Sequence, residues 1–469
     1  MLNRMMSLFG VGLMALLLSA CTMGLDYQQP DTMIPPSYKQ DARWKEAEPQ
    51  ATLEKGAWWE IYHDPVLNGL EHRAIEANQS LQAAFFRVQQ VRAGQRLSEA
   101  ERLPQINLSG SGSRERTAGD FSSDGHGRTG NIFSLPFLLS YEIDLWGRTR
   151  RSLEAASAES ESAVADYHAA LLSLQADVAR YYFNLRALDN EISLLEQTLG
   201  LLREALLLVR SQYENGQVSR LNLAQAETEL ANVQAEAVGL ERQRSDLVNA
   251  IAVLIGVPSS DFTLAAEPRE MNPPKISPGL PSSLLERRPD ISAAERQMAA
   301  ASARIGVARA AFFPSISLTG KAGFASEEIG SLFEWDNRTW GFGPALYLPI
   351  FDAGRNSAKL ERAKLGFEAA VATYRQQVLV AFEEVENGLQ GLEHLQRQEA
   401  LLQQALETAG DALDLSNKRY RSGYVSYLEV IDTQRTALQI ARSLSRLQGQ
   451  QMVTSTLLIK ALGGGWQTL

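Results

Sequence analysis

The 469-residue sequence predicts a mixed α and β fold of two tandem repeats, each with two transmembrane β-strands and long coiled-coil helices. Three observations lead to this prediction: phrases that recur about 207 residues apart, a heptad pattern of apolar residues, and segments in which apolar and polar residues alternate. LPQINLSGSG at 103–112 returns as FPSISLTGKA at 313–322, and YENGQVSRL at 213–221 returns as YRSGYVSYL at 420–428. Each repeat therefore reads helix, strand, loop, strand, helix, turn, helix.

The N-terminus has the features of a secretion signal. Arg4 precedes an apolar run at 8–18, and two small residues precede Cys21, the only cysteine of the chain. This run is too short to span a membrane as a helix. Leu-Ser-Ala-Cys resembles the lipobox of bacterial lipoproteins, which implies cleavage before Cys21 and lipidation of that residue. Thr22 follows, in place of the Asp that retains lipoproteins at the inner membrane.

The repeats and the proline-rich stretch between them set the expected domain organisation. We expect a signal peptide at 1–20, an N-terminal extended segment at 21–65, a first repeat at 66–256, a proline-rich linker at 257–282, a second repeat at 283–462 and a C-terminal tail at 463–469.

Each repeat contains one very long helix. From Val164 to Tyr213, in alternating steps of three and four, every residue is apolar or aromatic, which is the pattern of a coiled-coil seam. The second copy of the seam runs from Val371 to Tyr420, with exceptions at Gly388, Glu399 and Ser416. These helices should begin near 149 and 356 and extend roughly 65 residues, or about 100 Å. Shorter helices are expected at about 66–101, 219–256, 283–311 and 426–462.

The repeated phrase at 213 and 420 predicts a tight turn between two helices. Gly216 and Gly423 stand where a helix C-terminus favours a left-handed residue. Ser219 and Ser426 stand at the N-cap of the return helix, and Ser426 forms a capping box with Glu429. Each repeat should therefore end in an αα-hairpin, at the far end of the long helices from the strands.

The strands show a period of two. Phe133 to Leu145 present an apolar residue at every second position, and Trp340 to Ile350 repeat the pattern. Ile106, Leu108, Ile316 and Leu318 do so more briefly. Alternation of this kind, with an aromatic-rich apolar face, indicates a membrane β-barrel, although a two-layer sandwich with one wet face has the same pattern. The polar stretches 114–130 and 325–338 are expected to be hairpin loops.

Four strands cannot close a barrel, and an open sheet edge is not tolerated in lipid. The chain must therefore oligomerise. Two copies would give eight strands and a filled interior, whereas three would give twelve strands and a pore.

Several motifs resemble the TolC-like outer-membrane factors, in particular their NodT-type lipoprotein branch. They are LLERRPDISAAERQMAAASARIGVARAAFFPSISLTG at 284–320, DYQQP at 26–30, WWEIYHDPVLNGL at 58–70, DLWGR at 144–148, PIFDAGR at 349–355 and ALGGGW at 461–466. The resemblance implies a homotrimer in the outer membrane of a Gram-negative bacterium, with a twelve-stranded barrel continued by a periplasmic α-helical barrel. It further implies a passive exit duct for small toxic compounds, joined by a periplasmic adaptor to an inner-membrane pump of the resistance–nodulation–division class.

The same resemblance implies the functional residues at the hairpin tips. Leu428 and Asp432 correspond to the constriction of a periplasmic gate, with Tyr427 and Arg435 beside them and Arg220 on the other hairpin. Three Leu428 side chains would exclude water and three Asp432 carboxylates would repel one another unless a cation, from Arg435 or Arg220, stood nearby. An ordinary solvated pair of Asp432 and Arg435 is the alternative. The expected adaptor contacts are Gly216, Val218, Ser219, Gly423, Val425 and Ser426.

The sequence offers no catalytic constellation, cofactor motif or metal-binding spacing. The five histidines are scattered, at His63, His72, His126, His168 and His394. The net charge of −10 argues against a nucleic-acid partner. An outer-membrane-tethered coiled-coil spacer and the exit duct of a type I protein secretion system remain as alternatives to the efflux duct, and a periplasmic enzyme has no supporting residues.

Overall fold

The computed structural model describes residues 27–28, 56–118, 127–276 and 287–464. Cys21, the predicted signal peptide and most of the predicted N-terminal segment lie outside the described residues. The chain divides into two compact units, each of which draws on both repeats. Arg87–Val164 and Ala293–Arg375 make up most of the first, called the sheet unit below, and Ala165–Ser292 and Gln376–Leu469 make up most of the second, called the hairpin unit.

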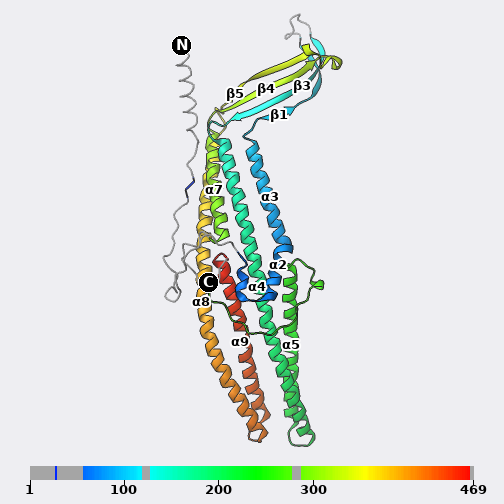
Figure 1. The fold of residues 1–469 in the computed structure, drawn as a ribbon, viewed down its shortest axis with the longest axis vertical. Coiled ribbons are helices and arrows are strands. Elements are labelled where there is room, and N and C mark those ends of the chain that lie inside the picture. Colours follow the sequence, from blue (N-terminus) through cyan, green and yellow to red (C-terminus); the bar gives the residue numbers. More distant parts are fainter. Residues whose placement is uncertain (1–26, 29–55, 119–126, 277–286, 465–469) are drawn as a thin grey trace. The chain divides into compact units, whose positions relative to one another are not determined.

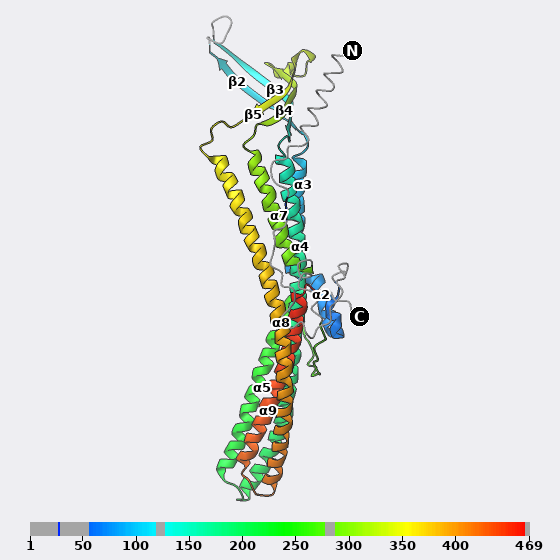
Figure 2. The ribbon, with the colours of Figure 1, turned by 90° about the vertical axis from the view of Figure 1, so that its left-hand side faces the viewer.

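The long helices are confirmed. Helix α4 comprises Arg148–Glu214 and α8 comprises Arg355–Arg421, each of 67 residues. Their return helices are α5 at Arg220–Leu254 and α9 at Tyr427–Ala461, each of 35 residues. Within the hairpin unit these helices run alongside one another in both views (Figures 1 and 2). The two repeats thus produce helices of identical length.

The prediction of a single helix at about 66–101 is wrong, because this segment forms two helices. After the short 3-10 helix η2 at Trp58–Tyr62, α2 comprises Pro65–Ala77 and α3 comprises Gln79–Ala100. Asn78 between them is extended; its Oδ1 accepts a hydrogen bond from the backbone N–H of Leu81 at 2.9 Å. Its Nδ2 donates to the carbonyl of Leu254 at 2.9 Å. This amide starts a new helix and fastens the break to α5.

The second pre-strand helix, α7, comprises Pro289–Ala310. Between the repeats, the described part of the predicted linker contains the 3-10 helix η4 at Ser259–Asp261 and is otherwise irregular up to residue 276. Asp189 of α4 holds this segment, because its carboxylate accepts from the backbone N–H of Glu267 at 3.1 Å and from Arg186 and Arg244.

The predicted seam is the buried face of both long helices. In α4, Tyr213 is the one seam position of the fifteen that is exposed, and in α8 all fifteen are buried or half-buried. The three exceptions in α8 have physical reasons. A Cβ at Gly388 would lie 3.0 Å from Leu458 Cδ1, so glycine permits close packing against α9. Glu399 accepts hydrogen bonds from Gln448 and Gln451 at 3.2 and 2.8 Å, and Ser416 is small enough to be buried.

The sheet is antiparallel and has the order β1-β3-β4-β5, with β2 also paired to β3. The strands are β1 at Gln105–Leu108, β2 at Ser111–Thr117, β3 at Arg128–Ile143, β4 at Ser315–Ser326 and β5 at Arg338–Tyr347. Leu108 pairs with Phe137 and Ser111 pairs with Ser134, so the register continues without a shift across the gap. Strands β1 and β2 are therefore one interrupted strand, and the four predicted strands are confirmed.

The predicted strand ends need correction. The loop predicted at 114–130 is shorter, because β2 continues to Thr117 and β3 begins at Arg128. These polar residues can belong to strands because backbone pairing does not require apolar side chains. The second loop contains the 3-10 helices η5 at Ile329–Ser331 and η6 at Trp335–Asn337. At the other end, the alternation to Leu145 and to Ile350 runs past the strands. Strand β4 begins at Ser315. The residues of β3 that follow Ile143 and the residues of β5 that follow Tyr347 therefore have no β4 backbone to pair with.

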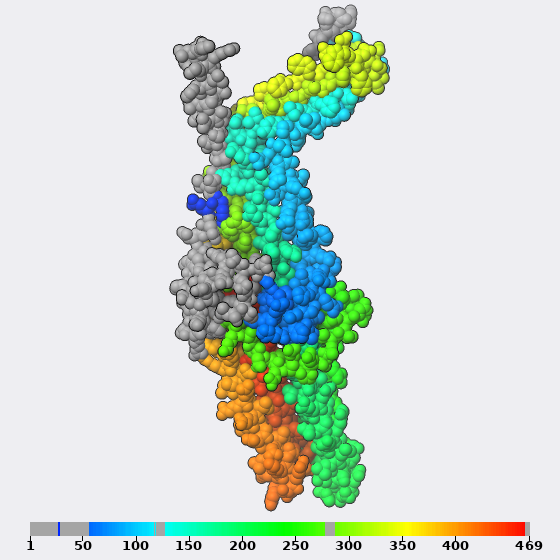
Figure 3. Space-filling view, in the orientation of Figure 1, coloured from blue at the N-terminus to red at the C-terminus, as the bar shows by residue number. Residues whose placement is uncertain are grey.

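One face of the sheet is apolar and uncovered. Apolar residues at alternate positions of the paired strands share this face and are exposed, among them Ile106, Leu108, Phe137, Trp340, Phe342 and Leu346. In the view of Figure 3, no helix of the sheet unit covers the strands. Among the described residues, none of the helices combines the length and the apolar character needed to cross a membrane.

Candidate functional site

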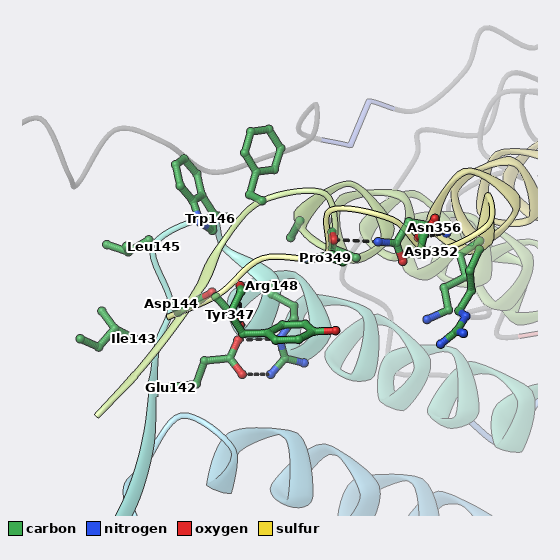
Figure 4. A pocket seen from close by; sticks show the side chains of 16 residues that line it. Glu142, Ile143, Asp144, Leu145, Trp146, Arg148, Tyr347, Pro349, Asp352 and Asn356 are labelled. Atoms are coloured by element: carbon green, nitrogen blue, oxygen red, sulfur yellow. Dashed lines mark hydrogen bonds and ion pairs between the residues drawn. The ribbon is translucent and has the colours of Figure 1, made fainter. Parts of the chain in front are cut away.

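The strand-to-helix junctions are built by the DLWGR and PIFDAGR motifs. In the first, Asp144 accepts hydrogen bonds from the backbone N–H groups of Thr149 and Arg150, at 3.1 and 2.9 Å, and so caps α4. Arg148 donates two hydrogen bonds to Glu142, at 2.8 and 2.9 Å (Figure 4). A bidentate pair of this kind fixes the direction in which the helix leaves the sheet.

The second junction repeats this chemistry. Asp352 accepts from the backbone N–H groups of Gly354 and Asn356, at 3.0 and 2.9 Å. These N–H groups, that of Asn356 foremost, lower the pKa of Asp352. Gly147 and Gly354 both have positive φ, 80° and 83°, which lets the chain turn sharply into each helix.

A cavity of about 280 Å³ lies at the two junctions. Its charged lining residues are three carboxylates and three cations, so it offers no net charge to an ionic ligand: Glu142, Asp144, Asp352, Arg148, Arg355 and Lys359. We interpret it as a structural joint. Among the described residues there is also no group of three or more His, Cys, Asp or Glu side chains placed to hold a metal ion.

The predicted helix turns are confirmed. Gly216 has φ 71° and Gly423 has φ 78°. The N–H of Gln217 donates to the carbonyl of Gln212 at 2.8 Å and that of Gly216 to Tyr213 at 2.9 Å, which is a Schellman motif. The second turn has the same two bonds, from Tyr424 to Arg419 at 3.0 Å and from Gly423 to Tyr420 at 2.9 Å.

The prediction that Ser219 and Ser426 cap the return helices through their side chains is wrong. Ser219 and Ser426 do occupy the N-cap positions, but neither side chain accepts a hydrogen bond from the first turn. Ser219 Oγ instead donates to Asn222 Oδ1 at 2.6 Å. The expected capping box fails because Arg419 of α8 binds the carboxylate of Glu429 at 3.3 Å. That bond ties α9 to its own hairpin partner.

Tyr427 lies in a core that joins the two hairpin tips. This tip core consists of Val209, Leu223, Ala226, Tyr427, Val430 and Ile431. Tyr427 is 3% exposed, and its ring lies 5.4 Å from that of Tyr420. Burial raises the pKa of Tyr427 to about 12. Tyr420 in turn donates to Gln212 of α4 at 2.9 Å. Within the chain Tyr427 is thus a packing residue that holds one hairpin against the other.

The ion pairs at the tips correct the expected partner of Arg435. Its guanidinium binds Glu229 of α5, with Nε 2.8 Å from Oε2, instead of Asp432. The Glu229 carboxylate raises the pKa of Arg435, with a smaller contribution from Asp432. Arg220 is also occupied, since it binds Glu227 at 3.2 Å. Asp432 is exposed, and no described residue forms an ion pair with it.

The remaining predicted residues lie on the surface of the two turns. Leu428 is 45% exposed, and its counterpart Leu221 is 66% exposed. Among the predicted adaptor contacts, the glycines and serines are exposed and the valines are half-buried: Gly216, Ser219, Gly423 and Ser426 in the first group, Val218 and Val425 in the second. The structure therefore brings both sets together at the same end of the hairpin unit, where α4 meets α5 and α8 meets α9 (Figure 1).

Glu229 is the residue of this site that the sequence interpretation missed. Glu229 is buried in α5, on the apolar stripe of this helix that also contains Leu223, Ala226 and Val233. A carboxylate in an otherwise apolar stripe is the available signal, because such a charge requires a cation from a neighbouring helix. Glu191 of α4 shows the same pattern, with Arg442 and Arg446 of α9 as its partners.

Comparison with known proteins agrees with this architecture. The sequence model described as "Outer membrane efflux protein" matches residues 70–257 and 280–464. The chain is 34% identical over 466 residues to outer membrane protein OprJ of Pseudomonas aeruginosa, covering 98% of this chain and 96% of that protein. It is 33% identical over 468 residues to the toluene efflux pump outer membrane protein TtgC of Pseudomonas putida, with the same coverage.

A solved structure of the outer-membrane channel OprN superimposes with a TM-score of 0.87 at 30% identity, covering 96% of this chain and all of that one. These matches span both repeats, the sheet and the hairpins. The chain therefore belongs to the outer membrane efflux protein family, and is a channel component of an efflux system and not an enzyme.

Proposed function

We propose that three copies of the chain form the exit duct of a tripartite efflux system. One observation carries this proposal: β1 with β2 at one edge of the sheet, and β5 at the other, each pair with a single strand. An apolar sheet with two free edges cannot remain open in lipid. Copies joined edge to edge close it, and three copies give twelve strands and leave an aqueous interior.

The cargo and the partners follow from the relatives. Several are named as components of toluene, solvent and antibiotic efflux pumps. We therefore propose small toxic compounds as the cargo of this chain. An outer-membrane component does no work of its own, so an inner-membrane pump of the resistance–nodulation–division class supplies the energy, and a periplasmic adaptor joins the two. The turn residues Gly216, Val218, Ser219, Gly423, Val425 and Ser426 are the proposed adaptor contacts.

The anchor and the gate complete the proposal. Lipid attached to Cys21 tethers the mature N-terminus to the outer membrane. At the hairpin tips, the exposed Leu428 and Asp432 of three copies surround the opening. Three carboxylates close together repel one another. In the closed state each Asp432 therefore forms a polar link to a cation of a neighbouring copy, the exposed guanidinium of Arg220 or Arg435, and an adaptor that separates the tips breaks these links.

Planar-bilayer recording of the purified mature protein tests the duct and the gate together. The wild-type protein should form stable channels, and Asp432→Ala combined with Arg435→Ala should raise the single-channel conductance while leaving the helical circular dichroism unchanged. Arg242→Ala with Asp246→Ala is the matched control, because it removes an exposed ion pair of 3.2 Å from α5. Absence of any channel would refute the duct, and equal conductance of the two double variants would refute the gate alone.

A further inference from the structure

Two arginines of β2 lie on the apolar face of the sheet. Residues that pair directly across antiparallel strands point to the same face. Gly112 pairs with Phe133 of the apolar face, and Arg114 and Arg116 follow Gly112 at alternate positions. Both arginine side chains are exposed, and their own partners on β3 are polar. The apolar face therefore becomes cationic at this end of β2.

A third arginine joins this face from β5. Arg338, the first residue of that strand, pairs with Phe324, and Phe324 pairs with Leu135 of the apolar face. The Arg338 guanidinium lies over the ring of Trp335, with Cζ 4.7 Å from the ring centroid, and its Nη1 donates to the Trp335 carbonyl at 2.7 Å. These contacts hold the side chain in place and leave its other N–H donors to a ligand.

The two faces of the sheet differ in charge. Among the paired strand residues that the structure describes, the charged ones on the apolar face are Arg114, Arg116 and Arg338, called the rim arginines below. The opposite face has charges of both signs: Glu115, Arg128, Glu142 and Lys321. Arg128 binds Glu327 at 3.0 Å, whereas no described residue forms an ion pair with a rim arginine. The rim arginines therefore lack a counter-ion within the described part of the chain.

The rim arginines lie towards the end of the sheet that is remote from the helices (Figure 1). On β3 the apolar face extends over ten residues, from Ile143 to Phe133, which corresponds to about 34 Å along the strand. At the usual tilt of barrel strands this length covers about 25 Å of membrane thickness, the height of the apolar band of a membrane barrel. Arg114 and Arg116 pair with β3 residues two and four positions beyond Phe133. They therefore lie just outside that band, at the level of lipid headgroups.

We propose that the rim arginines bind the phosphate groups of lipopolysaccharide in the outer leaflet of the outer membrane. The proposal rests on the proposed duct, in which the apolar face meets lipid and the helices extend into the periplasm, so that the rim arginines lie on the outer side. Lipopolysaccharide is the glycolipid of that leaflet, and its lipid A anchor has phosphates at the headgroup level. Binding to them neutralises the cations that the chain itself leaves unpaired.

The surroundings of the rim arginines fit such a lipid. A guanidinium can donate two parallel hydrogen bonds to one phosphate. The acyl chains of the same molecule would lie along the apolar residues of the face. Trp335 and Trp340, 72% and 78% exposed beside Arg338, are of the residue type that favours the boundary between acyl chains and headgroups. Glu334 and Asp336 flank Trp335, and neither forms an ion pair with Arg338 in the described part of the chain.

Native mass spectrometry of the mature protein in detergent tests this site, with purified bisphosphorylated lipid A as the probe. Arg114→Gln combined with Arg116→Gln should weaken lipid A binding by about tenfold or more, because two charge-assisted contacts to phosphate are lost. Arg338→Gln alone should weaken it severalfold. Lipid A from which both phosphates have been removed should bind the wild type as weakly as intact lipid A binds the double variant.

The matched control is Arg128→Gln combined with Lys321→Gln, which removes two positive charges from the opposite face. Its affinity for lipid A should stay within about twofold of the wild type, because charges on that face are screened from the lipid. Equal losses in the two double variants would overturn the site, since net charge alone would then explain binding. Equal affinity of the wild type for phosphatidylglycerol and lipid A would overturn the assignment to lipopolysaccharide.

Planar-bilayer recording separates this proposal from the duct on which it rests. Arg114→Gln with Arg116→Gln should form channels like those of the wild type, because both side chains lie on the outer surface of the proposed barrel. Normal channels together with unchanged lipid A binding in this variant would overturn the lipid site alone. A wild-type protein that forms no channels would overturn the duct itself.

Discussion

Arg435 of α9 and Glu229 of α5 form an ion pair, with Nε 2.8 Å from Oε2, that joins the two helix hairpins of one chain. The two ends differ in environment, since the Glu229 side chain is 7% exposed and that of Arg435 is 53% exposed. The buried carboxylate depends on its partner more than the exposed guanidinium does. This asymmetry determines which substitution should be costly.

Arg435→Ala should destabilise the hairpin unit by about 1–3 kcal/mol, because it leaves a buried carboxylate without a cation. Glu229→Gln should cost less, since a neutral amide at the same position still accepts a hydrogen bond from Arg435. The measurement is thermal unfolding of the mature protein in detergent, followed by helical circular dichroism. In the double variant the two effects should not add. Equal losses for both single variants would show that the Glu229 carboxylate does not depend on Arg435 more than Arg435 depends on Glu229.

This ion pair also shows where sequence interpretation reaches its limit. Periodicity gave the seam of α4 and α8, the two turns and the return helices, because these features depend on residues close together in the chain. The partner of Arg435 depends on which helices lie side by side. Asp432 is three residues away in sequence, yet Glu229, 206 residues away, makes the contact.

Glu71 of α2 should make stability depend on pH. It is fully buried, and neither carboxylate oxygen has a hydrogen-bond partner in the described part of the chain. Burial holds the pKa of Glu71 well above its usual 4.5. Above that pH the unfolded chain releases this proton while the folded chain keeps it. Stability from this group is therefore complete below about pH 4.5 and falls as pH rises, by up to about 1.4 kcal/mol per pH unit.

Glu71→Gln removes the titrating group and should flatten that dependence. We expect the variant to gain stability relative to the wild type between pH 5 and 8, as measured by the difference in melting temperature at each pH. Burying the amide of the glutamine has a cost that does not change with pH, so it does not affect how the stability difference varies with pH. Glu76→Gln on the exposed side of the same helix is the control. Parallel pH profiles for wild type and Glu71→Gln would contradict the prediction.

Gly449 of α9 should not tolerate a methyl group. A Cβ at this position would lie 2.5 Å from the Cβ of Ala187 in α4. Gly449→Ala should therefore cost about 1–3 kcal/mol through overpacking. Gly239→Ala in α5, where no atom lies within 4 Å of the added Cβ, should instead stabilise the helix by about 0.5–1 kcal/mol. Melting temperatures that shift in opposite directions would confirm both; a stable Gly449→Ala would show that the two helices can separate.

The strands were predicted less completely than the helices. Alternation identified the apolar face, because it depends only on side-chain type. It did not give the ends of β2, β3 and β5, because a strand ends where its neighbour ends. Arg114 and Arg116 belong to β2 although they look like loop residues, since they pair with Asn131 and Thr129.

Neighbouring positions of β3 should differ sharply in their tolerance of charge. Leu139 shares the apolar face with Ile106 and Gly320, its partners on either side, whereas Ser140 lies on the opposite face. If the apolar face meets lipid, Leu139→Arg should cost about 2–4 kcal/mol near the membrane midplane and lower the amount of trimer recovered from outer membranes. Ser140→Arg should leave recovery near the wild-type level, because its side chain would then face the aqueous interior of the proposed barrel. Both proteins are quantified in the same fractions against total chain. Equal recovery of the two variants would mean that the apolar face does not meet lipid, and a loss confined to Ser140→Arg would mean that the two faces are reversed.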